Sequence, residues 1–247
     1  HTLYVQERDA AGNWSSSGSR TIVIDTTAPA FSSLSPSTSS TVNTTAVGYT
    51  LSEAIASGTV TYTRGSGTAD SNSPHTVTLA GTELNSGTRS SAALTNAPTL
   101  VSCTTYTIAF NGTDAAGNNA TEQTVTGITY DTTASTITGT TVASNNESIA
   151  VTFSEAVHNT SGGSGALEAS DFTLTISGGT ATLASATPSS ISSSSNTYTL
   201  GLSLSGTPNG SETITVVPSS STAIYDAAGN AASTSQSNNT VTLNDQT

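Results

Sequence analysis

The sequence predicts an all-β protein made of tandem β-sandwiches, joined like beads on a string. Short runs of Thr, Val, Ile, Leu and Tyr alternate with polar residues, as half-buried strands require. The length of 247 residues suggests about two domains. Three short motifs also recur in one order at a period near 105 residues, which is the size of one sandwich and too long for a solenoid turn.

The three motifs fix the expected organisation of the chain. Asp-Ala-Ala-Gly-Asn occurs at residues 9–13, 114–118 and 226–230; Asp-Thr-Thr-Ala begins at Asp25 and Asp131; Ser-Glu-Ala begins at Ser52 and Ser154. A shortened copy of the second motif, Asp-Gln-Thr, ends the sequence. We therefore predict the C-terminal hairpin of a truncated repeat at residues 1–28, a complete repeat at 29–134 and a second complete repeat at 135–247.

Each predicted strand is a short apolar-alternating run between turn residues. The first segment supplies strands at about 2–6 and 21–24. The complete units supply seven each, at about 31–34, 46–51, 59–64, 75–79, 88–94, 105–111 and 122–130, and then at 136–142, 148–153, 172–176, 181–186, 197–204, 212–217 and 239–243. Residues 158–167, with their Gly-Gly-Ser-Gly core, predict a surface loop insertion. Seven such strands favour an immunoglobulin-like (Ig-like) sandwich of the Greek-key type.

Within this pattern a few residues are expected in the core. Phe153, Phe172, Tyr198 and Ile214 are the predicted core of the last unit. Cys103 is the only cysteine, so no intrachain disulfide can form, and we expect its side chain to be a small buried hydrophobe in a strand.

The charges exclude several classes of partner. The chain has 16 acidic residues against four basic ones, all arginines, and a formal charge of −12. We expect no nucleic-acid binding, because a surface that follows phosphates needs clustered Lys and Arg. No apolar run approaches the roughly 18 residues of a membrane-spanning segment, so we expect no membrane insertion.

An enzyme is not expected either. The three histidines, His1, His75 and His158, stand in unrelated contexts, and a Ser-His-Asp set requires specific mutual geometry. Glu53 and Glu155 occur once per repeat, as scaffold positions do. We expect His75 and His158 to be surface residues.

The repeated carboxylates have two readings. In Asp-Ala-Ala-Gly-Asn the Asp side chain suits a turn in which it accepts backbone N–H groups, while Gly and Asn tolerate a positive φ. Carboxylates held on a turn are also hard ligands for calcium. The last strand of a unit separates Asp114 from Asp131, so Asp131 is expected to share an ion only with a neighbouring domain.

The order of these motifs resembles the tandem bacterial Ig-like repeats of large extracellular adhesins and surface proteins. The similar segments are residues 151–157, 171–174 and 224–230, and in the middle unit 49–54, 114–118 and 130–134. The resemblance implies extension modules, with calcium bound by carboxylates at the domain joints. It nominates Asp25 and Asp131 as ligands, with Asp114 or Glu53 as partners. Ser135 replaces the Pro of the first joint, so the joints are expected to differ.

We therefore expect a non-enzymatic stalk segment of a secreted bacterial surface protein, with neighbouring repeats or copies of itself as partners. The alternative is a subunit of an extracellular filament or surface layer, in which the N-terminal hairpin completes a neighbour by strand addition. Glycans on Ser/Thr clusters such as 189–195, or on sequons such as 111–113 and 209–211, remain open.

Overall fold

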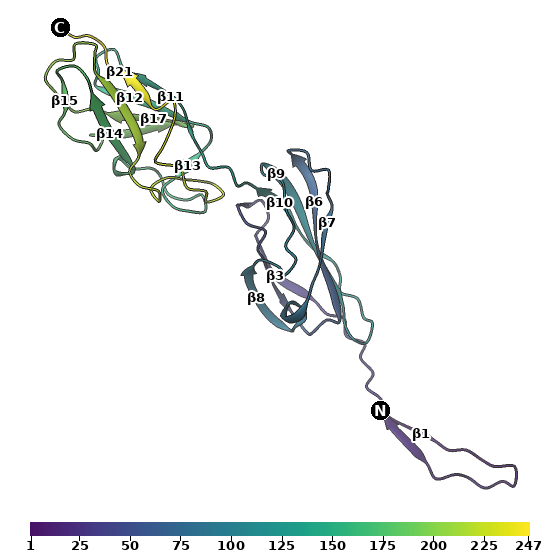
Figure 1. The fold of residues 1–247 in the computed structure, drawn as a ribbon. Coiled ribbons are helices and arrows are strands. Elements are labelled where there is room, and N and C mark those ends of the chain that lie inside the picture. The colour runs from purple at the N-terminus through teal and green to yellow at the C-terminus, as the bar shows by residue number, and fades with distance from the viewer.

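The structure, a computed structural model, describes residues 1–247, and its regular secondary structure is almost entirely β-strand. Figure 1 shows a hairpin and two larger bodies following one another along the chain. The C-terminus lies at one end of the molecule and the turn of the hairpin at the other, with the N-terminus at the base of the hairpin beside the linker. We call the body formed by β3 to β10 the middle unit and that formed by β11 to β21 the last unit. The helical segments are two short 3₁₀ turns, η1 (Gly81–Leu84) and η2 (Ala169–Asp171). None of them is long or apolar enough to cross a membrane.

The N-terminal hairpin pairs β1 (Thr2–Val5) with β2 (Gly18–Thr21) in antiparallel register. The second strand lies three residues earlier than the sequence pattern indicates. Several large apolar side chains of this segment are exposed, among them Tyr4 at 68% and Val23 at 89%. Trp14 is also exposed, at 63%, and its ring faces the Arg8 guanidinium of the same hairpin at 5.5 Å.

The middle unit is a sandwich of two sheets. One sheet has the order β3-β5-β8 and the other β4-β10-β9-β6-β7. The bounds are β3 Phe31–Ser35, β4 Thr41–Val42, β5 Val47–Leu51, β6 Ser57–Gly67, β7 His75–Thr78, β8 Gly87–Ala92, β9 Thr104–Thr113 and β10 Gln123–Tyr130. All seven predicted strands are present, and the additional strand β4 pairs parallel with the end of β10.

Alternation along these strands builds the core of the middle unit. On β9 the side chains of Tyr106, Ile108 and Phe110 point inward and are at most 2% exposed, while their neighbours face outward. The rings of Phe31, Tyr49 and Phe110 pack together, and each pair of ring centres is 5.4 to 6.0 Å apart. Such aromatic packing joins the two sheets.

The last unit repeats this plan with a different edge. Its sheets have the orders β11-β12-β17-β16 and β14-β19-β21, with two-residue pairs β13-β20 and β15-β18. The bounds are β11 Ile137–Val142, β12 Ser148–Phe153, β13 Val157–His158, β14 Phe172–Ser177, β15 Thr182–Leu183, β16 Ile191–Ser194, β17 Thr197–Gly201, β18 Leu204–Ser205, β19 Thr213–Pro218, β20 Tyr225–Asp226 and β21 Thr240–Thr242. The larger sheet of the middle unit thus ends in β7 beside β6, whereas the larger sheet of the last unit ends in β16 beside β17.

The predicted core of the last unit is confirmed. Phe153, Phe172, Tyr198 and Ile214 are all buried, with exposures between 0% and 8%, and the three rings lie 5.9 to 6.3 Å apart. The two cores are separate clusters, since no residue of one belongs to the other. The fold class is therefore confirmed as all-β with Ig-like sandwiches.

Some local expectations are wrong. Cys103 is exposed, not buried, because it occupies a turn with φ of +56° just before β9. His75 is not a free surface residue: its ring packs against Tyr106, and its Nε2 atom lies 2.6 Å from the Oδ2 atom of Asp70. The serine-rich run 189–195 contains the strand β16, whose polar composition gave no apolar alternation to detect.

Candidate metal sites at the joints between units

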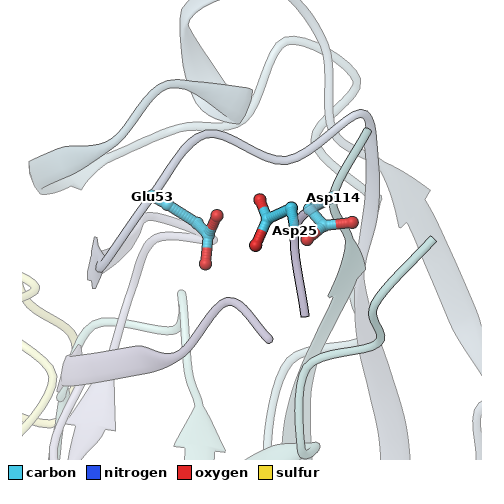
Figure 2. Close-up of side chains that lie close together, drawn as sticks. All are labelled: Asp25, Glu53 and Asp114. Atoms are coloured by element: carbon cyan, nitrogen blue, oxygen red, sulfur yellow. The ribbon is translucent and has the colours of Figure 1, made fainter. Parts of the chain in front are cut away.

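Two clusters of three carboxylates lie where a linker meets the following unit. In the first, Asp25, Glu53 and Asp114 each present one oxygen, and these oxygens lie within 4.8 Å of one another. Figure 2 shows the carboxylate of Glu53 facing those of Asp25 and Asp114. In the second, Asp131, Glu155 and Asp226 meet the same criterion. We call them cluster 1 and cluster 2.

The two clusters are built from equivalent positions of the repeat. The linker Asp precedes the first strand of a unit, and the Glu follows the strand that pairs with that first strand, β5 or β12. The third carboxylate begins the Asp-Ala-Ala-Gly-Asn turn, directly after β9 or at the end of β20. The repeat spacing therefore carries all three residues of cluster 1 onto those of cluster 2.

The Ser of Ser-Glu-Ala fixes the strand that follows the linker. The backbone N–H of Ala30 donates to Ser52 Oγ at 2.9 Å, and the N–H of Ser52 donates back to the Ala30 carbonyl at 3.1 Å. Thr136 and Ser154 make the same pair of bonds at 3.0 and 2.8 Å. Each Ser thus holds the chain beside the Glu that joins the cluster.

The pentapeptide forms one turn in all three places. The backbone N–H groups of Ala116 and Asn118 donate to Asp114 Oδ1 at 2.9 and 2.8 Å, and Asn118 Nδ2 donates to Asp114 Oδ2 at 2.8 Å. The Gly in fourth position has φ between +89° and +95° in the three copies, a region in which a Cβ is strained. The N-terminal hairpin keeps the turn around Asp9, so the turn forms without a complete sandwich around it.

The linker Asp also makes a constant local turn. Its Oδ1 atom accepts the N–H of the second residue after it at 3.0 Å for Asp25, 2.9 Å for Asp131 and 2.8 Å for Asp245. The shortened terminal motif, Asp245-Gln246-Thr247, therefore retains this feature of the full one. The turn needs only the Asp and a free N–H two residues later.

The clusters concentrate unneutralised charge. Together they hold six of the 16 acidic residues of the chain, and neither of the two ion pairs in the structure involves them. Burial, with the charges of Asp226 and Asp131, raises the pKa of Glu155 to about 7. Burial, with the charges of Asp25 and Asp114, also raises the pKa of Glu53. The side-chain hydrogen bond from Asn118 comes first among the contacts that hold the pKa of Asp114 below its usual value.

The donor set fits a hard divalent cation. Three carboxylates offer only oxygen, the ligand atom that Ca²⁺ prefers, and Ca²⁺ accepts main-chain carbonyls and waters in its remaining positions. A carboxylate has about four lone-pair sites, of which Asp226 uses one for the N–H of Asn230 and one for its Nδ2 group. Capacity therefore remains on this buried side chain. No thiol or imidazole is in either cluster.

The structure brings together the nominated residues Asp25, Glu53 and Asp114. Asp131 lies apart from Glu53 and Asp114 and meets two residues of the following unit, as the strand-length argument requires. Sequence reasoning did not nominate Glu155 or Asp226 for this second cluster. The signal was available, because each is the repeat equivalent of a residue nominated for the first.

Comparison with protein families places the middle of the chain in a known setting. The family model described as bacterial Ig-like domain matches residues 25–133. That range begins at the linker Asp25 and ends two residues after Asp131, so it contains the whole of cluster 1. No curated protein matches the chain.

Proposed function

We propose that this chain is a stalk segment of a secreted bacterial surface protein, because residues 25–133 match the model of the bacterial Ig-like domain family, a structural domain of such proteins. Its task is reach and stiffness, with any adhesive contact made by another part of the protein. The observation that carries the proposal is that the same joint occurs twice along the chain. Each joint has a linker, a strand held by the Ser of Ser-Glu-Ala, a pentapeptide turn and a cluster of three carboxylates.

Calcium at the joints is part of the proposal. The ion would be held by Asp25, Glu53 and Asp114 at the first joint, and by Asp131, Glu155 and Asp226 at the second. In each set the linker Asp is covalently continuous with the preceding unit, while the other two belong to the following one. An ion shared among them would hinder bending of the linker and would offset the repulsion of three like charges.

Calcium-dependent stiffness is tested by thermal melting and small-angle X-ray scattering with calcium and with chelator. We expect chelation to lower the melting temperature and to increase bending between units. A variant with Asp131→Asn and Asp226→Asn should lose the response of the second joint. Glu122→Gln removes an exposed charge outside both clusters and serves as the control. Superimposable curves in calcium and chelator would refute the metal assignment.

A second candidate is favoured by the N-terminal hairpin. Leu3, Tyr4 and Val5 on β1 are more than half exposed, as are Val23 and Ile24 after β2. Hydrophobic strands with open edges pair readily with other chains, so a filament or surface layer assembled by strand addition is the alternative. Electron microscopy separates the two, because isolated short rods favour the stalk and ordered polymers favour the filament.

A further inference from the structure

The last residue of each pentapeptide contacts the preceding linker as well as its own turn. Asn118 Nδ2 donates to the main-chain carbonyl of Asp25 at 3.2 Å, across 93 residues of sequence. Asn230 Nδ2 donates to the carbonyl of Asp131 at 3.0 Å, across 99 residues. In both cases the same nitrogen also donates to the pentapeptide Asp, at 2.8 Å. One amide group therefore connects the linker to a turn that lies about a hundred residues later in the sequence, near the end of the following unit.

At the second joint this amide uses both its nitrogen and its oxygen. Its nitrogen makes the two bonds above, and its Oδ1 atom accepts from Asn43 Nδ2 at 3.2 Å. Asn43 belongs to the middle unit, between β4 and β5, so Asn230 touches the preceding unit, the linker and its own turn. A primary amide has two N–H donors and an acceptor on one planar group. Asp would lack the donors, and Ser has only one.

The preceding unit holds the other side of the same linker. The N–H of Asp131 donates to the carbonyl of Val42 at 2.9 Å, and Ser102 Oγ donates to Asp131 Oδ1 at 3.0 Å. Space beside the turn is also limited: a Cβ at Gly229 would lie 2.7 Å from Ser161 Oγ and 3.8 Å from Asn43 Nδ2. The linker therefore lies between two hydrogen-bonding surfaces that need no ion.

We infer that Asn118 and Asn230 are positioning residues that fasten each linker to the following unit without metal, and so hold the linker carboxylate beside its two partners. The second half of this inference rests on the proposed calcium function; the first half does not. If the fastener is lost, only a fraction of molecules has a docked linker, and the apparent calcium affinity falls to that fraction of its original value.

The test measures distances between units in the full chain. Spin labels are placed on Ser90→Cys in β8 and Ser192→Cys in β16, both exposed, with Cys103→Ser removing the native thiol. Asn230→Ala is the test variant. Asn13→Ala is the matched control, because Asn13 makes the same turn contacts in the hairpin, away from the second joint. Asn43→Ala removes one bond of the fastener and leaves the pentapeptide intact.

Pulsed electron paramagnetic resonance in chelator tests the fastener. We expect Asn230→Ala to broaden the distance distribution, Asn43→Ala to broaden it less, and Asn13→Ala to leave it unchanged. Unchanged distributions for Asn230→Ala and Asn43→Ala would overturn the inference, and so would equal broadening by Asn13→Ala. If Asn230→Ala unfolds the last unit, the Asn43→Ala result alone decides.

Calorimetric titration with calcium tests the positioning. In a Glu53→Gln background, which disables cluster 1, Asn230→Ala is expected to weaken binding at cluster 2 about tenfold, the loss expected from one or two net hydrogen bonds. Undiminished affinity would overturn the positioning role. If Asn230→Ala broadens the distance distribution in chelator but no variant binds calcium, the proposed metal function is refuted, whereas the metal-free role of Asn230 is supported.

Discussion

Glu155 and Asp226 present carboxylate oxygens within 4.8 Å of each other although 71 residues separate them, and Asp131 joins them from the linker. No basic side chain pairs with any of the three. Like charges brought this close favour the protonated form of one member. Without a metal, a proton on Glu155 relieves this repulsion, and a bound cation would have to displace that proton from the same oxygens.

In calcium-free buffer we expect stability to increase as the pH falls from 8 to about 5.5. The pKa of Glu155 is raised from its ordinary value of 4.5 to about 7 in the folded state. The folded state then binds more protons than the unfolded state between these values, so stability is lost as the pH rises through 7. Melting temperatures across the pH series measure this. A Glu155→Gln variant should show a flatter profile, and an equally steep one would contradict the assignment.

Glu155→Gln should change stability in opposite directions with and without calcium. At pH 8 without calcium the substitution removes a charge from a repelling trio, so the melting temperature is expected to rise. With calcium it removes a ligand, so the stabilisation by the ion is expected to shrink. Scanning calorimetry in both buffers tests the sign change, with Glu122→Gln as the control that should respond alike in each. The same direction of change in both buffers would count against a metal at this joint.

Asp70 is expected to stabilise the middle unit above its titration range. Its carboxylate accepts from the Tyr106 hydroxyl at 2.7 Å and from the Asn72 N–H at 3.1 Å, beside His75 Nε2. The hydrogen bond with His75, and then that with Tyr106, hold the pKa of Asp70 below its usual value. This stability is present above the unfolded pKa and is lost as the pH falls through the folded one.

Asp70→Asn should therefore lower the melting temperature of the middle unit at pH 7 and have less effect near pH 3, about one unit below the ordinary aspartate pKa. Melting curves at the two pH values make the comparison. Glu122→Gln, which removes an exposed carboxylate of the same unit, should have little effect at either. An Asp70→Asn effect of the same size at both pH values would show that the carboxylate charge is not the cause.

The two units should unfold independently. Phe153 is 2% exposed and packs against Phe172 and Tyr198, so Phe153→Ala should cost about 3 to 5 kcal/mol in the last unit. Phe110→Ala should have the matching effect in the middle unit, because the two cores share no residue. Calorimetry with two resolved transitions checks this. A common shift of both transitions would contradict the predicted boundary at residue 134.

Most of the fold could be predicted because the alternation is local. Runs such as Thr104–Thr113 carry inward and outward positions in the sequence itself, and each maps onto one strand. The strand Ile191–Ser194 could not be found in this way, since a serine-rich edge has almost no apolar positions. Cys103 was misassigned because its residue type favours burial, whereas its turn backbone places it at the surface.

The candidate sites were predictable as residue types but not as sets. Repeat arithmetic identifies Asp25, Glu53 and Asp114 as repeated carboxylates, yet only the sandwich topology brings the end of β5 beside the end of β9. The role of Asn118 and Asn230 was hidden for another reason. The acceptors of their hydrogen bonds are main-chain carbonyls. Every residue type offers such a carbonyl, so the sequence carries no sign of the partner.

The long sequence separation between Asp131 and Asn230 also bears on how the protein is made. A chain that emerges from its N-terminus delivers the linker 99 residues before the amide that captures it. The linker therefore cannot bond to the following unit until almost the whole of that sandwich has been synthesised. Until that unit has folded, only the preceding unit holds the linker, and the joint is then expected to be more open to proteases that cleave flexible segments.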